Sequence, residues 1–378
     1  MKILYFAPVD WNFLWQRPHH ILTRLSSLYN YDIDYVQPLG VRNIQLSDIK
    51  RALSRFVTLF KRSYASSHNI KIKNLIFIPF VYSLARHINI SMLKQQLKKN
   101  IDKDTIIWVT TPAHVIPDII SSLPYRSLIY EMMDDYQCFH PLRKKEIDVT
   151  EQWLMKNADL IITTSRALYE KAHEIDARQV IMNIPNGVDY EFFEQSLKSS
   201  KKSSSGNPTI GFIGALNERI DFEIIELMAE RWKNYSFILV GPVKAKIFPQ
   251  KENIHYVGTV EYSKVPHYCN SFDVCLIPFT PGEFADTINP IKLYEYFALG
   301  KPVVAYKMKE LEPYNDLLYL AKDKEDFLLN VEKAIAENNP QLSERRKLIA
   351  RQNDWSVRVK SIEDLIQCHI VRNTGHKS

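Results

Sequence analysis

The chain has no apolar run close to the ~20 residues that a helix needs to cross a bilayer. Its opening, MKILYFAPVD, has too short an apolar core for a signal peptide and instead predicts a first strand. The four cysteines are scattered without metal-ligand spacing, so we expect free thiols in a reducing cytoplasm. These features argue against an integral membrane protein and favour a cytoplasmic one.

Acidic residues are scarce between Arg42 and Asn100. The net charge is only +6, but from Arg42 to Asn100 the sole acidic residue is Asp48, among many lysines and arginines. Such asymmetry predicts an anionic partner for one face of the first domain. No recognised binding module accompanies the basic residues, so we expect no nucleic acid partner.

The segment 47–63, SDIKRALSRFVTLFKRS, predicts an amphipathic helix inside this basic region. Its apolar stripe contains two phenylalanines, and its lysines and arginines lie largely off the stripe. A basic amphipathic helix fits the surface of an anionic membrane. The alternative is a helix that packs on its own sheet with a basic, solvated face.

Short apolar runs alternate with helical patterns in two series. The strand candidates are 2–8, 32–38, 75–80, 106–111, 127–133, 160–165, 180–186, 209–215, 237–242, 254–260, 274–279 and 302–306. This alternation predicts an α/β protein with two doubly wound parallel sheets. The polar stretch 196–208 is the candidate linker, and it separates a first domain, 1–195, from a second, 209–354.

The stretch 289–306 predicts a helix followed by a buried strand. Asn289 suits the helix cap, Pro290 suits the first helical position, and Gly300 ends the helix. Glu295 then lies one turn from Lys292. On spacing alone the two form a solvated i,i+3 pair worth a few tenths of a kcal/mol.

The run from Pro290 to Val304, P-x-K-x-x-E-Y-x-A-x-G-K-P-V-V, resembles the donor-site signature of GT-B glycosyltransferases. The resemblance is strongest to family-four-type enzymes that build bacterial cell-surface polysaccharides. It covers nearly the whole chain and implies two Rossmann-like domains facing a cleft, with the terminal helix 355–372 crossing back onto the first domain. Typical members carry a second glutamate eight residues before Glu295, where this chain has Thr287.

The resemblance also implies a donor site for a nucleoside-diphosphate-sugar. Glu295 would grip the ribose hydroxyls, and Arg219 and Lys292 would meet the diphosphate. A glycine turn before a helix is itself a place for phosphates, although the chain has neither G-x-G-x-x-G nor a Walker loop there. The remaining donor-site candidates are Gly214, Gly241, Thr259, Thr287, Ile288 and Asn289.

The loop after the first predicted strand carries W-x-x-x-W-Q-R-P, which resembles a subgroup related to the teichuronic-acid glycosyltransferases. Trp11 and Trp15 could stack on sugar rings of an acceptor, and Arg17 could meet an anionic acceptor group. Alternatively, Trp15 covers the sheet, and His19 and His20 are ordinary helix residues.

Three further candidates follow predicted strands, where ligands of doubly wound sheets bind. His114 follows one strand, and Asp134 and Asp135 follow the next. The resemblance implies a residue of this second loop close to the reacting sugar, and a carboxylate there could accept the acceptor hydroxyl proton. Alternatively, Asp135 caps the next helix and Asp134 is solvated.

The sequence therefore predicts a glycosyltransferase that moves a sugar from a nucleoside-diphosphate-sugar to a surface-polysaccharide or lipid-linked acceptor. No metal or cofactor is expected, because fixed cationic groups can stabilise a departing diphosphate. We expect the protein at the inner face of the plasma membrane. The alternatives are a sugar-nucleotide epimerase of related fold and a non-catalytic partner protein that kept the fold.

Overall fold

A computed structural model describes residues 1–39, 69–75, 83–98, 101–139, 144–175, 180–199 and 206–371. The predicted amphipathic helix 47–63 lies outside these ranges. The chain divides into two compact units, one formed by 1–184 with 359–378 and the other by 185–358. Each unit has its own sheet and its own core.

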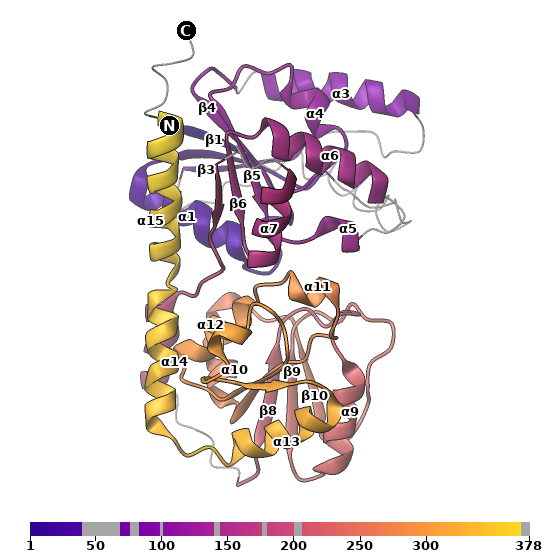
Figure 1. The fold of residues 1–378 in the computed structure, drawn as a ribbon, viewed down its shortest axis with the longest axis vertical. Coiled ribbons are helices and arrows are strands. Elements are labelled where there is room, and N and C mark those ends of the chain that lie inside the picture. Colours follow the sequence, from indigo (N-terminus) through magenta and orange to yellow (C-terminus); the bar gives the residue numbers. More distant parts are fainter. Residues whose placement is uncertain are drawn as a thin grey trace. The chain divides into compact units, whose positions relative to one another are not determined.

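The first unit is a parallel sheet of seven strands in the order β3-β2-β1-β4-β5-β6-β7. The strands are β1 (Lys2–Phe6), β2 (Asp32–Val36), β3 (Ile70–Lys73), β4 (Thr105–Val109), β5 (Ser127–Met132), β6 (Leu160–Thr163) and β7 (Ile181–Asn183). The helices are α1 (Arg17–Tyr29), α3 (Ser83–Lys98), α4 (Ile116–Ile120), α5 (Tyr136–Phe139), α6 (Lys144–Asn157) and α7 (Arg166–Ile175) (Figure 1). Strand β3 is not among the runs expected from the sequence.

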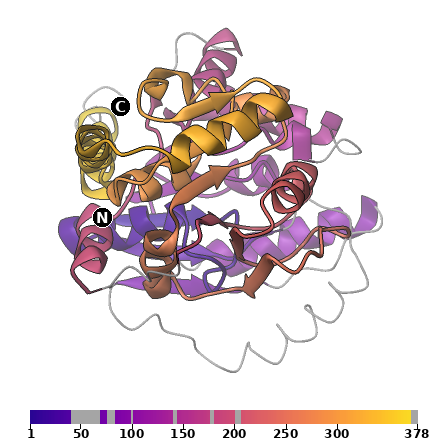
Figure 2. The ribbon, with the colours of Figure 1, turned by 90° about the horizontal axis from the view of Figure 1, so that it is seen from below.

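The second unit is a parallel sheet of six strands in the order β10-β9-β8-β11-β12-β13. The strands are β8 (Thr209–Ile213), β9 (Ser236–Val240), β10 (Ile254–Gly258), β11 (Val274–Ile277), β12 (Val303–Tyr306) and β13 (Tyr319–Ala321). The helices are α8 (Tyr190–Ser199), α9 (Phe222–Arg231), α10 (Val265–Ser271), α11 (Glu283–Asp286), α12 (Ile291–Ala298), α13 (Lys324–Ile335) and α14 (Pro340–Gln352). Helix α13, orange in Figure 2, packs on β12 and β13.

The last helix, α15 (Trp355–Leu365), begins in the second unit and continues as a π-helical turn, η4 (Ile366–Val371), in the first. The sequence places residues 185–195 in the first domain, but the chain enters the second unit at Pro185. Helix α8 packs on α10 and α12 there, because its apolar face completes that core.

Both sheets reverse their strand order once, between β1 and β4 in the first unit and between β8 and β11 in the second. Ligands of such sheets bind beyond the carboxyl ends of the strands at this reversal. The loops that follow β1, β4 and β5, and those that follow β8, β9 and β11, are therefore where a site is expected.

Candidate functional site

Helix α12 buries the carboxylate that the donor-site pattern singles out. Glu295 is only 2% exposed, and its Oε2 accepts a hydrogen bond from Lys292 Nζ at 2.6 Å. The Lys292 side chain is 23% exposed, so the ammonium group reaches the surface. A solvated pair would leave both groups in water, so that interpretation is wrong for Glu295. A buried carboxylate loses water contacts that only specific partners can replace.

Asn289 is not the helix cap that the sequence predicts, because α12 starts after Pro290, its N-cap residue. The Asn289 side chain is instead buried in a network. Its Oδ1 accepts from the Asn186 backbone N–H at 2.9 Å, and its Nδ2 donates to Glu310 at 2.9 Å and Tyr294 at 3.2 Å. Because these contacts engage the whole side-chain amide, Asn289 holds loops together.

Position 287 offers no carboxylate, as the sequence indicates. The Thr287 hydroxyl donates to the Phe284 carbonyl oxygen at 2.8 Å and so closes α11. The neighbouring carboxylate, Asp286, accepts the Lys309 backbone N–H at 3.2 Å. Ile288 is half-buried beside them. Of the donor candidates in this segment, Glu295 is therefore the one with a carboxylate.

The loops after β8 and β9 touch through two glycines. Gly241 has a φ of 139°, and a Cβ there would lie 1.8 Å from the Gly214 carbonyl oxygen. The Gly241 N–H donates to the Gly258 carbonyl oxygen at 2.8 Å. No side chain fits between these backbones, so Gly214 and Gly241 allow three strand-ending loops to meet. Thr259, which follows, is exposed.

We expect Gly241→Ala to destabilise the second unit by roughly 1–3 kcal/mol or more, because strain in φ and a backbone clash add. Gly258→Ala is the matched control: Gly258 has a φ of 81° but nothing within 4 Å of a Cβ, so it tests the φ strain alone. Urea unfolding measures both free energies. Equal losses in the two variants would contradict the close approach.

Arg219 lies in the loop that follows β8. Its guanidinium packs 4.6 Å from the centroid of the Phe284 ring, and its carbonyl oxygen accepts the Thr280 N–H at 2.8 Å. Asn217 Oδ1 accepts the Arg219 N–H at 3.1 Å. These contacts tie the loop after β8 to the loop after β11. Arg219, which is half-buried, therefore lies at the reversal of the sheet, and its contact with a diphosphate stays a prediction.

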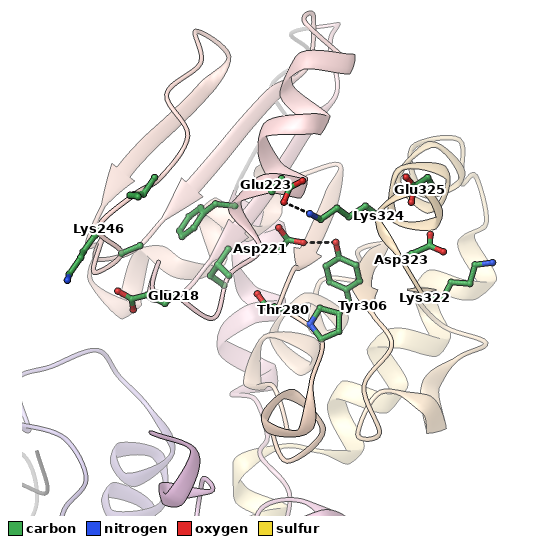
Figure 3. Close-up of a pocket in the computed structure, with 15 residues that line it drawn as sticks. Glu218, Asp221, Glu223, Lys246, Thr280, Tyr306, Lys322, Asp323, Lys324 and Glu325 are labelled. Atoms are coloured by element: carbon green, nitrogen blue, oxygen red, sulfur yellow. Dashed lines mark hydrogen bonds and ion pairs between the residues drawn. The ribbon is translucent and has the colours of Figure 1, made fainter. Parts of the chain in front are cut away.

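A pocket of about 750 Å³ opens beside the first turns of α9 and α13 (Figure 3). In it the Tyr306 hydroxyl donates to Asp221 at 2.8 Å, and Lys324 pairs with Glu223. The charged lining residues are Glu218, Asp221, Glu223, Asp323 and Glu325 against Lys246, Lys322 and Lys324. This acidic excess disfavours an anionic nucleoside diphosphate, and Glu295 and Lys292 do not line the pocket.

In the first unit, the loop after β1 forms an aromatic cluster with α1. The Trp11 and Trp15 rings meet edge to face with centroids 6.2 Å apart, and the His19 ring lies 4.9 Å from each. Trp15 keeps 37% of its surface exposed. The cluster therefore presents an indole to the surface, while Trp11 is half-buried.

His19 fastens this cluster to the start of α1. Its Nδ1 accepts the Gln16 backbone N–H at 3.1 Å, and its Nε2 lies 2.9 Å from the Trp11 carbonyl oxygen. These two contacts require the neutral ring with the proton on Nε2. Burial lowers the pKa of His19, which also favours the neutral form. His19 and the buried His20, whose Nδ1 accepts from Trp15 Nε1 at 3.3 Å, are more than ordinary helix residues.

Arg17 does not lie where an acceptor could reach it. Its side chain is 1% exposed, and its Nε donates to Glu131 Oε1 at 2.7 Å. Glu131 is fully buried on β5. The prediction that Arg17 meets an anionic acceptor group is therefore wrong, because the guanidinium is held inside the unit.

The loop after β5 gives its two aspartates different surroundings. Asp135 accepts the Gln137 N–H at 3.1 Å and pairs with Lys171 at 3.1 Å. Lys171 also pairs with the buried Glu151 at 3.0 Å. Burial lowers the pKa of Lys171, but the two carboxylates outweigh it and raise that pKa. Asp135 thus caps the start of the next helix, as the alternative predicts, and it also forms an ion pair with Lys171.

Asp134 is half-buried beside Tyr136. Burial raises the pKa of Tyr136, and the charge of Asp134 adds to the rise. The Tyr136 hydroxyl lies 3.4 Å from Thr111 Oγ1, so the loops after β4 and β5 are in contact. His114 is half-buried in the first of these loops. Asp134 therefore lies where two strand-ending loops meet, and it stays a candidate for acid–base work.

Metal-binding clusters and membrane-spanning helices are both absent from the described ranges. There, three or more His, Cys, Asp or Glu side chains nowhere gather in a way that could hold a metal ion. In the same ranges, no helix is long and apolar enough to cross a membrane.

Solved structures share this architecture. Anabaena HepE, solved with UDP and glucose, superimposes with a TM-score of 0.65 and 17% identity over 97% of this chain and 100% of that chain. An α,α-trehalose-phosphate synthase (UDP-forming) of Burkholderia vietnamiensis gives a TM-score of 0.68 and 12% identity over 97% and 96% of the two chains. The predicted GT-B fold is confirmed.

Sequence comparison defines the class of enzyme. Residues 207–337 match the family described as glycosyl transferases group 1, so the second unit carries a group 1 domain and the chain is a glycosyltransferase. A curated relative is TuaH of Bacillus subtilis (strain 168), provisionally named a teichuronic acid biosynthesis glycosyltransferase. It is 26% identical over 280 residues, which are 68% of this chain and 70% of that protein. The resemblance seen in the sequence is confirmed.

Sequence reasoning missed Glu131. It lies within SLIYEMM, an otherwise apolar strand, and a single carboxylate in a run expected to be buried on both faces is itself a signal. Its partner Arg17 is 114 residues away in the sequence, so the pair could not be found from local spacing.

Proposed function

We propose that the chain transfers a sugar from a UDP-sugar to a saccharide or lipid-linked acceptor of surface-polysaccharide synthesis. The observation that carries the proposal is the buried Glu295 on α12, inside the group 1 domain and beside the reversal of its sheet. The choice of UDP is supported by HepE, which was solved with UDP and with UDP-glucose. The acceptor class is supported by the name of TuaH.

In this proposal the donor lies over the carboxyl ends of β8 and β11. Glu295 accepts hydrogen bonds from the ribose hydroxyls through Oε1, the oxygen that does not accept from Lys292. Lys292 and Arg219 place positive charge beside the diphosphate, whose negative charge grows as the sugar leaves. Fixed cations in a partly buried site stabilise such a leaving group without reorganisation. The proposal includes no metal.

The acceptor lies on the first unit. Trp15 offers an exposed indole face, and such a face packs well on the C–H surface of a sugar ring. Asp134 accepts the proton of the attacking hydroxyl, because it lies in the loop at the carboxyl end of β5, where ligands of such sheets bind. An inverting reaction follows if Asp134 is this base.

The basic segment 47–63 attaches the protein to the inner face of an anionic membrane. Replacing Lys50, Arg51, Arg55, Lys61 and Arg62 with Gln should weaken sedimentation with phosphatidylglycerol vesicles, since each such residue is worth about 1 kcal/mol near the surface. The effect should shrink as salt is added. Binding to vesicles that does not change after the five substitutions would remove the membrane from the proposal.

A thermal-shift screen with UDP, GDP, ADP and CDP tests the donor class. A ligand that binds only the folded state at 100 times its Kd stabilises that state by about 2.7 kcal/mol. We expect the largest rise in Tm with UDP. No rise with UDP, or a larger one with another nucleotide, would overturn the choice of donor.

A further inference from the structure

A single carboxylate connects three elements beneath the aromatic loop of the first unit. Glu131, on β5, accepts from Arg17 Nε at 2.7 Å through Oε1. Its Oε2 accepts from Trp108 Nε1 at 3.0 Å, on β4, and from the Tyr5 hydroxyl at 3.4 Å, on β1. Burial raises the pKa of Tyr5, and the charge of Glu131 raises it further. The carboxylate is thus a fully buried centre with three donors.

Stability alone does not account for this arrangement. Removing two charges from water costs much of what their attraction returns, and well-packed apolar residues often do as well or better in such places. Buried polar networks can instead fix one arrangement of the chain. The question is which part of the molecule this network fixes.

The contacts lead from Glu131 to the tryptophans. Arg17 is the first residue of α1, and it follows Trp15 after a single residue. His19, in the same helical turn, receives the Gln16 N–H and contacts the Trp11 carbonyl oxygen. Both indole rings pack on His19. Anchoring the first turn of α1 therefore anchors the ring on which the tryptophans rest.

The other end of the network leads to the candidate base. Glu131 stands three residues before Asp134 in the chain, at the carboxyl end of β5. The Arg17–Glu131 pair consequently joins the loop that carries Trp15 to the strand that leads into the Asp134 loop. A shift of either Arg17 or Glu131 would change the distance between Trp15, on which the acceptor sugar packs, and Asp134, which takes the proton of the acceptor hydroxyl.

We propose that Arg17 and Glu131 are positioning residues that hold the tryptophan loop in register with the Asp134 loop. They touch no substrate and act through His19, Trp11 and Trp15. Their consequence for transfer rests on the acceptor role proposed above for Trp15. Their effect on the two indole rings does not depend on that role.

Fluorine NMR of protein labelled with 5-fluorotryptophan tests the proposal directly. The chain has 6 tryptophans, and substitution of each by Phe assigns the signals. In Glu131→Gln we expect the Trp11 and Trp15 signals to move by more than their line widths, together with that of the direct partner Trp108. Trp232 and Trp355, in the second unit, should keep their signals.

Glu151→Gln is the matched control. Glu151 is also fully buried in the first unit, accepts from the Tyr130 hydroxyl at 3.1 Å and pairs with Lys171. Its loss should leave the Trp11 and Trp15 signals in place. Movement of Trp108 alone in Glu131→Gln, or equal movement of Trp11 and Trp15 in both variants, would overturn the proposal.

Two further variants keep the test decisive. If Glu131→Gln does not fold, Arg17→Gln with Glu131→Gln leaves no unpaired charge in the core and is held to the same criteria. Arg17→Lys keeps the charge but not the Nε geometry. It should lower stability less than Glu131→Gln does, but it should still move the Trp11 and Trp15 signals away from their wild-type positions. UDP titration of Glu131→Gln should match wild type. Absence of UDP binding in wild type would count against the donor proposal and leave the fluorine result standing.

Discussion

Glu295→Gln should lower the affinity for UDP by roughly 10- to 100-fold, which corresponds to about 1.4–2.8 kcal/mol. A carboxylate that accepts from two ribose hydroxyls uses its charge, and hydrogen bonds to charged groups contribute about 1.5–3 kcal/mol each. The amide has nearly the same shape but offers one acceptor and one donor. It also leaves Lys292 without its ionised partner at 2.6 Å. Calorimetric titration of UDP into both proteins gives the two affinities.

Glu344→Gln is the control for this result. Glu344 forms an i,i+3 pair with Lys347 on α14 in the same unit, but its side chain is 72% exposed. Its loss should change stability by only a few tenths of a kcal/mol and leave UDP binding unchanged. Equal affinities of wild type and Glu295→Gln would place the nucleotide elsewhere.

Asp134→Asn should reduce turnover by about 10²–10⁴-fold, the usual contribution of a general base. UDP affinity should not change, because the proposed donor contacts come from the second unit. Steady-state transfer assays and calorimetry separate the two effects.

Asp135→Asn is the companion variant. It keeps an oxygen that can accept the Gln137 N–H but removes the charge opposite Lys171, so it should lower stability by up to about 1 kcal/mol and affect turnover less than Asp134→Asn. If Asp134→Asn retains full turnover, Asp134 is not the base, and a retaining reaction that uses the donor phosphate becomes the better account.

The fold could be predicted from the sequence because its strands are short apolar runs, typical of parallel sheets covered on both faces. Two strands of the described ranges were not predicted. Strand β3 reads Ile-Lys-Ile-Lys at the edge of the first sheet, and β13 has only three residues at the edge of the second. Edge strands need less apolar character, so hydrophobicity alone does not reveal them.

For the site, the sequence predicted some neighbouring residues correctly and gave others the wrong surroundings. Glu295 and Lys292 are three residues apart on one helix, so the sequence could place them together. The partners of Arg17 and Asp135 are far along the chain, and these partners decide that Arg17 is buried and that Asp135 is tied to Lys171. Local spacing contains no information about such pairs. The prediction of Asn289 as a helix cap was wrong for the same reason, because its side chain forms hydrogen bonds with Asn186 and Glu310.

The most direct test of the account is the fate of the sugar. Purified protein is incubated with UDP-[¹⁴C]glucose and other labelled UDP-sugars, with and without detergent-solubilised bacterial membranes that contain lipid-linked glycans. We expect UDP release and label in the lipid or polymer fraction only when membranes are present, and less of both with Glu295→Gln at donor concentrations that do not saturate this variant. Label that stays on the nucleotide as a changed sugar would indicate an epimerase. Unchanged donor in every mixture would contradict a catalytic role.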